Sequence, residues 1–157
     1  MRNIILAAML AAVVAAPSWA HETKIGQLVI EHAYARASAG PAKNGAAYFT
    51  VRNEGVTDDR LVAVKSTLAK RTELHTHIND GGVMRMRPVE GGIPLLAGMK
   101  TKLMPGGLHV MMMGLNGPLF EGETIQIELN FEKAGSITID VEVEGVAAGA
   151  HGKHKND

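Results

Sequence analysis

The chain has 157 residues and no cysteine, and its 16 lysines and arginines balance 16 aspartates and glutamates, so the formal net charge is zero. Without thiols it cannot form disulfides, and it cannot build a blue-copper site, a zinc ribbon or a cysteine nucleophile, because each needs a cysteine sulfur. A neutral chain also lacks the positive field that attracts nucleic acids, so we expect no nucleic-acid partner.

The first twenty residues have the layout of a secretory signal peptide. Arg2 precedes an apolar run over residues 4–16, and small residues lead up to Ala20. We expect residues 1–20 to be removed, export to the periplasm, a mature chain that begins at His21, and no membrane insertion after cleavage. An uncleaved anchor is the alternative, but the apolar run is short for a membrane span.

Residues 21–145 are predicted to form one domain of short strands. Residues 124–131 alternate between apolar and polar, residues 136–143 repeat the pattern, and residues 132–135 between them predict the turn of an antiparallel hairpin. Further strands are predicted at residues 27–31, 46–51, 61–66, 72–78, 83–89, 101–104 and 108–113, with turns at 53–59, 79–82, 91–94 and 105–107. So many short strands favour an all-β, two-sheet antiparallel sandwich.

Methionine and histidine cluster in the second half of this domain. Seven of the nine methionines lie between Met84 and Met113, and His75, His77 and His109 bracket the same stretch. A single methionine in a strand most often fills a gap in the core, and this alternative applies to each one taken alone. The clustering alone therefore does not indicate a metal site, and the spacing of these residues has to be considered as well.

Spacings of two residues place several of these side chains on shared strand faces, because residues i and i+2 of a strand project to the same side. Met84 and Met86 form one such set, and His109, Met111 and Met113 form another. The alternate residues Leu108, Val110 and Met112 are then expected to face the core, which makes Met112 a structural residue.

Imidazole nitrogen and thioether sulfur together suit Cu(I), a soft ion, whereas Mg²⁺ and Ca²⁺ prefer hard oxygen ligands. Zinc more usually takes cysteine, histidine or carboxylate ligands. An all-neutral ligand set leaves the positive charge of the ion uncompensated, which favours the cuprous over the cupric state. The sequence therefore predicts a copper site built from histidine and methionine.

The spacing of these residues resembles the His/Met copper motif of the PCu(A)C periplasmic copper chaperones. His75 is followed by ten residues and Met86, and then by twenty-two residues and the pair His109-x-Met111. The likeness extends over roughly Gln27 to Val143. The matching flanks are Asn44-Gly-Ala-Ala-Tyr48, Asp59-Arg-Leu61, Glu73-Leu-His75, Gly82 to Gly91 and Pro105 to Leu115.

The resemblance implies a cupredoxin-like (Ig-like) β-sandwich that binds one Cu(I) near its surface through His75, Met86, His109 and Met111. It also implies a carrier, not an enzyme, that delivers copper for the CuA centre of cytochrome c oxidase. The expected partners are the CuA domain itself, a Sco-type protein, or both. We expect the protein to act as a monomer.

Further donors are candidates for extra ligands. His77 follows the first histidine where relatives often have a methionine, and Met84 and Met113 share faces with the expected ligands. Residues 146–157 are expected to be a flexible tail. Its two histidines, with the histidine of the new N-terminus, are candidates for a secondary Cu(II) site: His21, His151 and His154.

Two other functions remain open from the sequence. A copper-sequestering or resistance protein would use the same four ligands. A copper enzyme would instead use the amine and ring of His21, and would need a second histidine opposite it.

Overall fold

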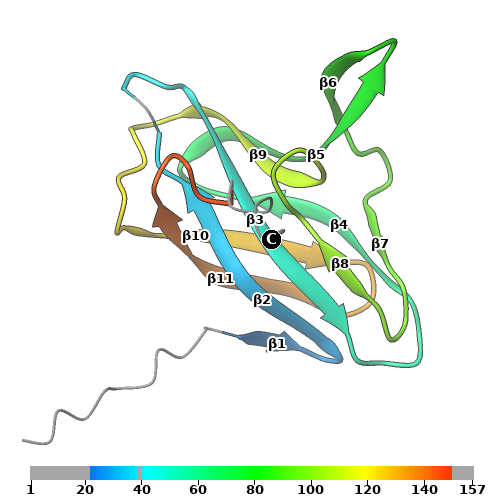
Figure 1. Ribbon diagram of the computed structural model, residues 1–157. Coiled ribbons are helices and arrows are strands. Elements are labelled where there is room, and N and C mark those ends of the chain that lie inside the picture. Colours follow the sequence, from blue (N-terminus) through cyan, green and yellow to red (C-terminus); the bar gives the residue numbers. More distant parts are fainter. Residues whose placement is uncertain (1–21, 39, 150–157) are drawn as a thin grey trace, which may run out of the picture.

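The structure is a computed structural model that describes residues 22–38 and 40–149 (Figure 1). This part of the chain consists of strands joined by turns and contains no helix, so the predicted all-β class is confirmed. No helix in it could therefore cross a membrane. The strands are β1 (Thr23–Ile25), β2 (Leu28–Arg36), β3 (Asn44–Asn53), β4 (Asp59–Lys65), β5 (Ala69–Asp80), β6 (Val83–Pro88), β7 (Ile93–Leu95), β8 (Lys100–Lys102), β9 (His109–Leu115), β10 (Thr124–Phe131) and β11 (Gly135–Glu144).

The strands form one continuous hydrogen-bonded path in the order β6-β5-β9-β3-β2-β11-β10-β4-β7, with β1 added to β2 and β8 to β3. Neighbouring strands are antiparallel except β2 and β11, which run parallel, so the sheet is mixed. The register of β2 on β3 shifts between Glu31 and Tyr34, and His32 at the shift has φ 52°. After this bulge, β2 pairs with β11 from Tyr34 onward.

The core follows from alternation along the strands. In β10, Ile125, Ile127 and Leu129 are buried, and the polar residues between them are more exposed. The predicted hairpin is confirmed, because β10 and β11 pair in antiparallel register up to Phe131 and Gly135. Apolar side chains from most strands meet in one core; its largest fully buried members include Phe49, Leu61, Ile127, Leu129, Ile139 and Met112.

Two elements differ from the prediction. Residues 91–94 were expected to form only a turn, but Ile93–Leu95 pairs with β4 as strand β7. Its central residue, Pro94, has no N–H to donate, and β7 tolerates it because it is the last strand of the path. The three-residue strand β1 was not predicted, since it is too short to show an alternating pattern.

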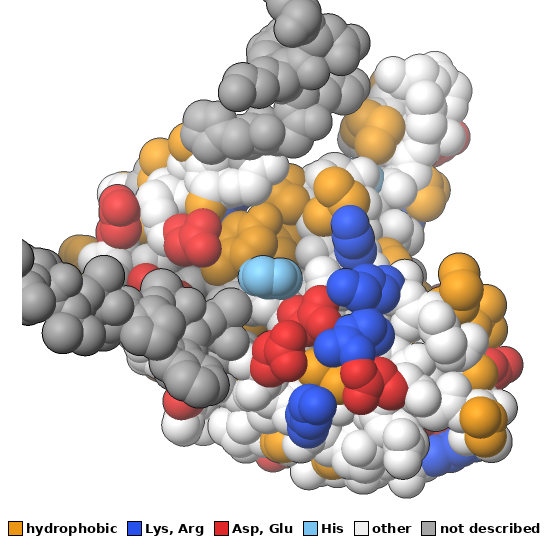
Figure 2. All heavy atoms as spheres, turned by 60° about the horizontal axis from the view of Figure 1, so that its bottom comes forward, with side chains coloured by type: hydrophobic (Ala, Val, Ile, Leu, Met, Phe, Trp, Pro, Cys, Tyr) orange, Lys and Arg blue, Asp and Glu red, His pale blue; other side chains and the backbone are white. Residues whose placement is uncertain are grey.

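Two features of the surface matter for function. Figure 1 shows that β6 and the adjoining end of β5 project from the body as a hairpin, and all six residues of β6 are exposed. Figure 2 shows lysine and arginine side chains beside aspartate and glutamate side chains on one face of the molecule. This face has no field of a single sign, in keeping with the neutral chain.

Candidate metal centre

Strand pairing brings the sequence-predicted donors to one face of three adjacent strands. On β5 and β9, His75 lies directly opposite His109, and Glu73 lies opposite Met111. On β5 and β6, His77 lies opposite Met86. Directly paired residues and residues two apart project to the same side of a sheet, so the imidazoles and thioethers share one face.

A cavity of about 410 Å³ opens on this face. Four possible soft-metal donors line it: His77, Met86, His109 and Met111. We call it the donor cavity. Ala46 and Gly45 of β3 form part of its wall, and such small side chains leave room above the donors. Three of the four ligands expected from the sequence, Met86, His109 and Met111, thus line one cavity.

His75, the fourth expected ligand, lies beside this cavity and is not among the residues that line it. Its side chain is buried, with 9% of the residue exposed, and its ring centroid lies 5.9 Å from that of His109. Its Nε2 lies 3.0 Å from Oε2 of Glu73. Its Nδ1 is buried and has no hydrogen-bond partner among the described residues. If Nε2 carries the proton, Nδ1 presents a free lone pair, which is the state that a metal ligand requires.

The turn before β9 orients the other two imidazoles. The carbonyl oxygen of Gly107 lies 3.0 Å from Nδ1 of His109 and 3.4 Å from Nδ1 of His77. One carbonyl oxygen has two lone pairs and accepts both N–H groups. This arrangement favours the tautomers that carry the ring proton on Nδ1, in which Nε2 of both rings is free to bind a metal.

Electrostatics keep the central imidazole neutral. Burial lowers the pKa of His109, and nearby His77 and His75 act in the same direction, while the hydrogen bond to Gly107 opposes the shift. A neutral imidazole is the form that binds metal. The pKa of Glu73 is lowered by its hydrogen bond to His75 and by Arg71, so this group stays a carboxylate. Arg71 Nη2 lies 2.7 Å from Glu73 Oε1, which leaves the other carboxylate oxygen for His75.

Aromatic side chains form the wall behind His109. The ring of Tyr48 lies 6.4 Å from that of His109, and the ring of Tyr34 lies 5.1 Å from Tyr48, measured between centroids. The guanidinium of Arg36 lies over Tyr48 at 5.6 Å. Burial raises the pKa of both tyrosines, which therefore remain neutral phenols in this wall.

The other sequence-predicted donors have different surroundings. Met84 and Met113 do not line the donor cavity; Met84 is 57% exposed on the projecting hairpin. Met112 is fully buried, as predicted from the alternation of side chains along its strand. The three histidines expected to form a secondary site lie outside the described residues, as do the predicted signal peptide and most of the predicted tail: His21, His151 and His154.

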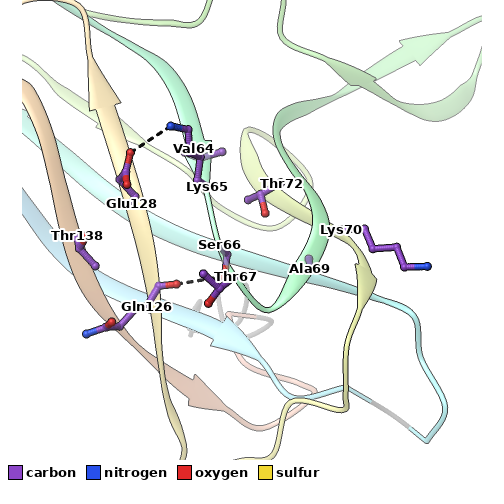
Figure 3. A pocket seen from close by; sticks show the side chains of 10 residues that line it. All are labelled: Val64, Lys65, Ser66, Thr67, Ala69, Lys70, Thr72, Gln126, Glu128 and Thr138. Atoms are coloured by element: carbon purple, nitrogen blue, oxygen red, sulfur yellow. Dashed lines mark hydrogen bonds and ion pairs between the residues drawn. The ribbon is translucent and has the colours of Figure 1, made fainter.

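A second cavity, of about 490 Å³, lies between β4, β10 and the start of β5 (Figure 3). Thr72 and Lys70 line it from β5, and these residues alternate with Arg71 and Glu73 of the donor face. Its other lining residues include Gln126 and Glu128, and it contains no histidine or methionine. It offers nothing to a soft metal.

Sequence reasoning missed two residues of the candidate centre. Glu73 stands two residues before His75, and strand parity alone could have placed its carboxylate on the same face. No side-chain pattern in the sequence indicates the carbonyl of Gly107, because its contacts depend on β5 and β9 lying side by side.

The chain matches the family model of LpqE-like lipoproteins over residues 28–143. It is 32% identical over 110 residues to the Lxx21020 protein of Leifsonia xyli subsp. xyli (strain CTCB07), whose name describes it as a lipoprotein. It is 29% identical over 104 residues to the uncharacterised protein RP573 of Rickettsia prowazekii (strain Madrid E). These alignments cover 70% and 66% of this chain, and 66% and 58% of those proteins.

Solved structures give the same assignment. The copper-bound PCuAC domain from PmoF2 is 30% identical with a TM-score of 0.68, and the alignment covers 80% of this chain and 98% of that domain. The apo PCuAC domain from PmoF1 is 31% identical at the same TM-score, with 80% and 99% covered. CuI-DR1885 from Deinococcus radiodurans is 26% identical with a TM-score of 0.53, with 81% and 83% covered. The chain therefore belongs to the LpqE-like family of PCuAC-type proteins.

Proposed function

We propose that this protein is an exported copper carrier that binds one Cu(I) through His75, Met86, His109 and Met111. The observation that carries the proposal is the meeting of imidazole and thioether groups on one face of β5, β6 and β9, around the donor cavity. The unpartnered Nδ1 of His75 and the tautomer that Gly107 favours in His109 each leave one ring nitrogen with a lone pair for a metal.

The kinds of donor select the ion. Within residues 22–38 and 40–149, no group of three or more histidine, aspartate or glutamate side chains is placed to hold a metal. A complete ligand set therefore has to include thioethers, which favour a soft ion such as Cu(I). The relatives support copper as the cargo, because the PmoF2 domain is copper-bound and DR1885 is described with Cu(I).

Carriage requires that the ion can leave. Met86 is 46% exposed on the projecting β5–β6 hairpin, so a partner can reach its sulfur first. Neutral ligands can be exchanged one at a time with those of an acceptor. We propose the CuA domain of cytochrome c oxidase, or a Sco-type protein, as that acceptor. Storage or resistance would use the same ligands and differ only in the absence of an acceptor.

Export to the periplasm is part of the proposal. Its support is the signal-peptide pattern of residues 1–20 and the lipoprotein names of the family and of the Leifsonia relative. We propose that the mature protein is released into the periplasm after cleavage of residues 1–20.

A competition titration against a Cu(I) chelator tests the binding site. The mature protein should bind one Cu(I), and the double variant Met86→Leu, Met111→Leu should lose that binding while remaining folded, since leucine is similar in size to methionine. Met99→Leu is the matched control, because Met99 is 56% exposed and does not line the donor cavity. Unchanged affinity in the double variant would contradict the site.

A transfer experiment separates delivery from storage. Copper-loaded protein is mixed with an apo CuA domain, and samples are oxidised with ferricyanide at intervals. The absorption of the mixed-valence CuA centre, which two transferred Cu(I) ions form by losing one electron, is then measured. Growth of the band faster than with an equal amount of chelated Cu(I) is expected for a carrier. Retention of copper by this protein in the presence of excess apo domain would favour the storage alternative.

A further inference from the structure

We propose that His77 is an additional copper ligand, which holds the ion in place of His75 while copper enters and leaves the donor cavity. This inference rests on the proposed copper-carrier function and extends it. It gives the protein two ligand sets that share three residues and differ in one imidazole.

The first evidence is position. His77 lines the donor cavity together with Met86, His109 and Met111, whereas His75 lies beside it and is 9% exposed. His77 also lies directly opposite Met86 in the β5–β6 pairing. The cavity by itself therefore presents two imidazoles and two thioethers, a complete set of the same chemistry as the set that contains His75.

The second evidence is the state of the ring. Nδ1 of His77 contacts the same Gly107 carbonyl that fixes His109, and the two ring centroids are 5.1 Å apart. Both contacts favour the tautomer that carries its proton on Nδ1, in which Nε2 is free for a metal. The His77 contact, at 3.4 Å, is longer than a normal hydrogen bond, so this ring is held less firmly than the ring of His109. A loosely held donor is suited to picking up and releasing an ion.

The third evidence is the relation between the two alternative imidazoles. His75 and His77 stand two residues apart on β5, about 7 Å along the strand, and project to the same face. His75 is restrained by Glu73 and buried, while His77 is nearer to the exposed hairpin. Copper can move between an inner and an outer set by exchanging one imidazole for the other. Met86, His109 and Met111 can stay in place during this exchange.

A double-mutant cycle tests the proposal. Cu(I) affinity is measured by chelator competition for the wild type, His75→Gln, His77→Gln and the double variant. If either imidazole can complete the set, the double variant should lose at least about tenfold more affinity than the product of the two single losses. His32→Gln is the control for loss of a histidine that does not line the cavity. A double variant with the same affinity as His75→Gln alone would overturn the proposal.

Histidine NMR of the wild type gives a second, independent readout. Long-range ¹H–¹⁵N spectra of the apo protein should show His77 and His109 protonated on Nδ1 and His75 protonated on Nε2. Addition of one equivalent of Cu(I) should shift Nε2 of both His109 and His77. A shift at His109 without one at His77 would overturn the role of His77 but leave the copper-carrier function standing. Absence of Cu(I) binding by the wild type would instead refute the proposed function itself.

Discussion

Two neighbouring methionines of β9 face opposite sides of the sheet. Met112 is fully buried in the core, whereas Met111 is only partly buried and lines the donor cavity. The two thioethers are chemically identical, and the pleat alone sends one to each side of the sheet. Substitution of Met112 would therefore act on folding, and substitution of Met111 on metal binding.

Glu73 is predicted to act through His75. Its carboxylate accepts a hydrogen bond from Nε2–H of His75, which leaves Nδ1 as the free nitrogen. Glu73→Leu removes this restraint, and loss of such an outer partner typically weakens metal binding about 10- to 100-fold. We expect a Cu(I) affinity about tenfold lower in the leucine variant. Glu73→Gln, which keeps an acceptor oxygen, should lose less.

Chelator competition in the His77→Gln background is the measurement, because there His77 cannot compensate for His75. The tautomer of His75 in the apo protein, read by NMR, is the accompanying control. An affinity equal to that of His77→Gln alone, together with an unchanged tautomer, would show that Glu73 does not position His75.

At the scale of elements, the turn between β8 and β9 positions a backbone carbonyl that contacts two histidines of the candidate metal site. Gly107 N donates to Met104 O at 3.0 Å, Pro105 occupies the second position, and Gly106 has φ 81°. These features define a type II turn, in which the third position favours glycine. The turn fixes the Gly107 carbonyl that both His77 and His109 contact.

Gly106→Ala is predicted to disturb both stability and binding. An added Cβ would meet no atom within 4 Å, so the cost comes from the positive φ alone and should be about 1 kcal/mol of unfolding free energy. Relaxation of the turn would also move the Gly107 carbonyl and weaken Cu(I) binding. Urea unfolding and chelator competition measure the two effects. Gly26→Ala, also at positive φ with open space but in the turn between β1 and β2, should affect stability only.

The alternation of apolar and polar residues predicted the strands that show it clearly. It could not predict which strands pair when they lie far apart in the sequence. The β10–β11 hairpin was predicted because its two segments alternate cleanly and are joined by a short turn. The shared face of His109 and Met111 followed from spacing in the same way. Nothing in the local sequence could show that β2 pairs in parallel with β11, or that Ile93–Leu95 finds a partner in β4. Nor could spacing tell whether His75 or His77 lines the cavity, because both lie on the same face of β5.

At the scale of the whole molecule, an ionic cluster around the buried Glu31 takes part in joining strands that no disulfide can join. Glu31 of β2 is 7% exposed, and its two carboxylate oxygens contact Arg52 of β3 at 2.7 Å and Lys100 of β8 at 3.3 Å. Its pKa lies below the ordinary value of 4.5, chiefly because of the hydrogen bond from Arg52, with Lys100 adding to the effect. Loss of a basic partner would leave the buried Glu31 carboxylate less well compensated, which is costly.

This cluster predicts how stability depends on pH. Because folding lowers the pKa of Glu31, the folded protein binds that proton less tightly than the unfolded chain does. The contribution of Glu31 is therefore complete above about pH 4.5 and is lost as the pH falls through its lower folded-state pKa. Glu31→Gln cannot titrate, so the gap in unfolding free energy between wild type and variant should be largest near pH 7 and should narrow as the pH falls below about 4.5. Urea unfolding of both proteins between pH 7 and pH 3, without copper, measures that gap, and a gap that stays constant over this range would contradict the ionic role of Glu31.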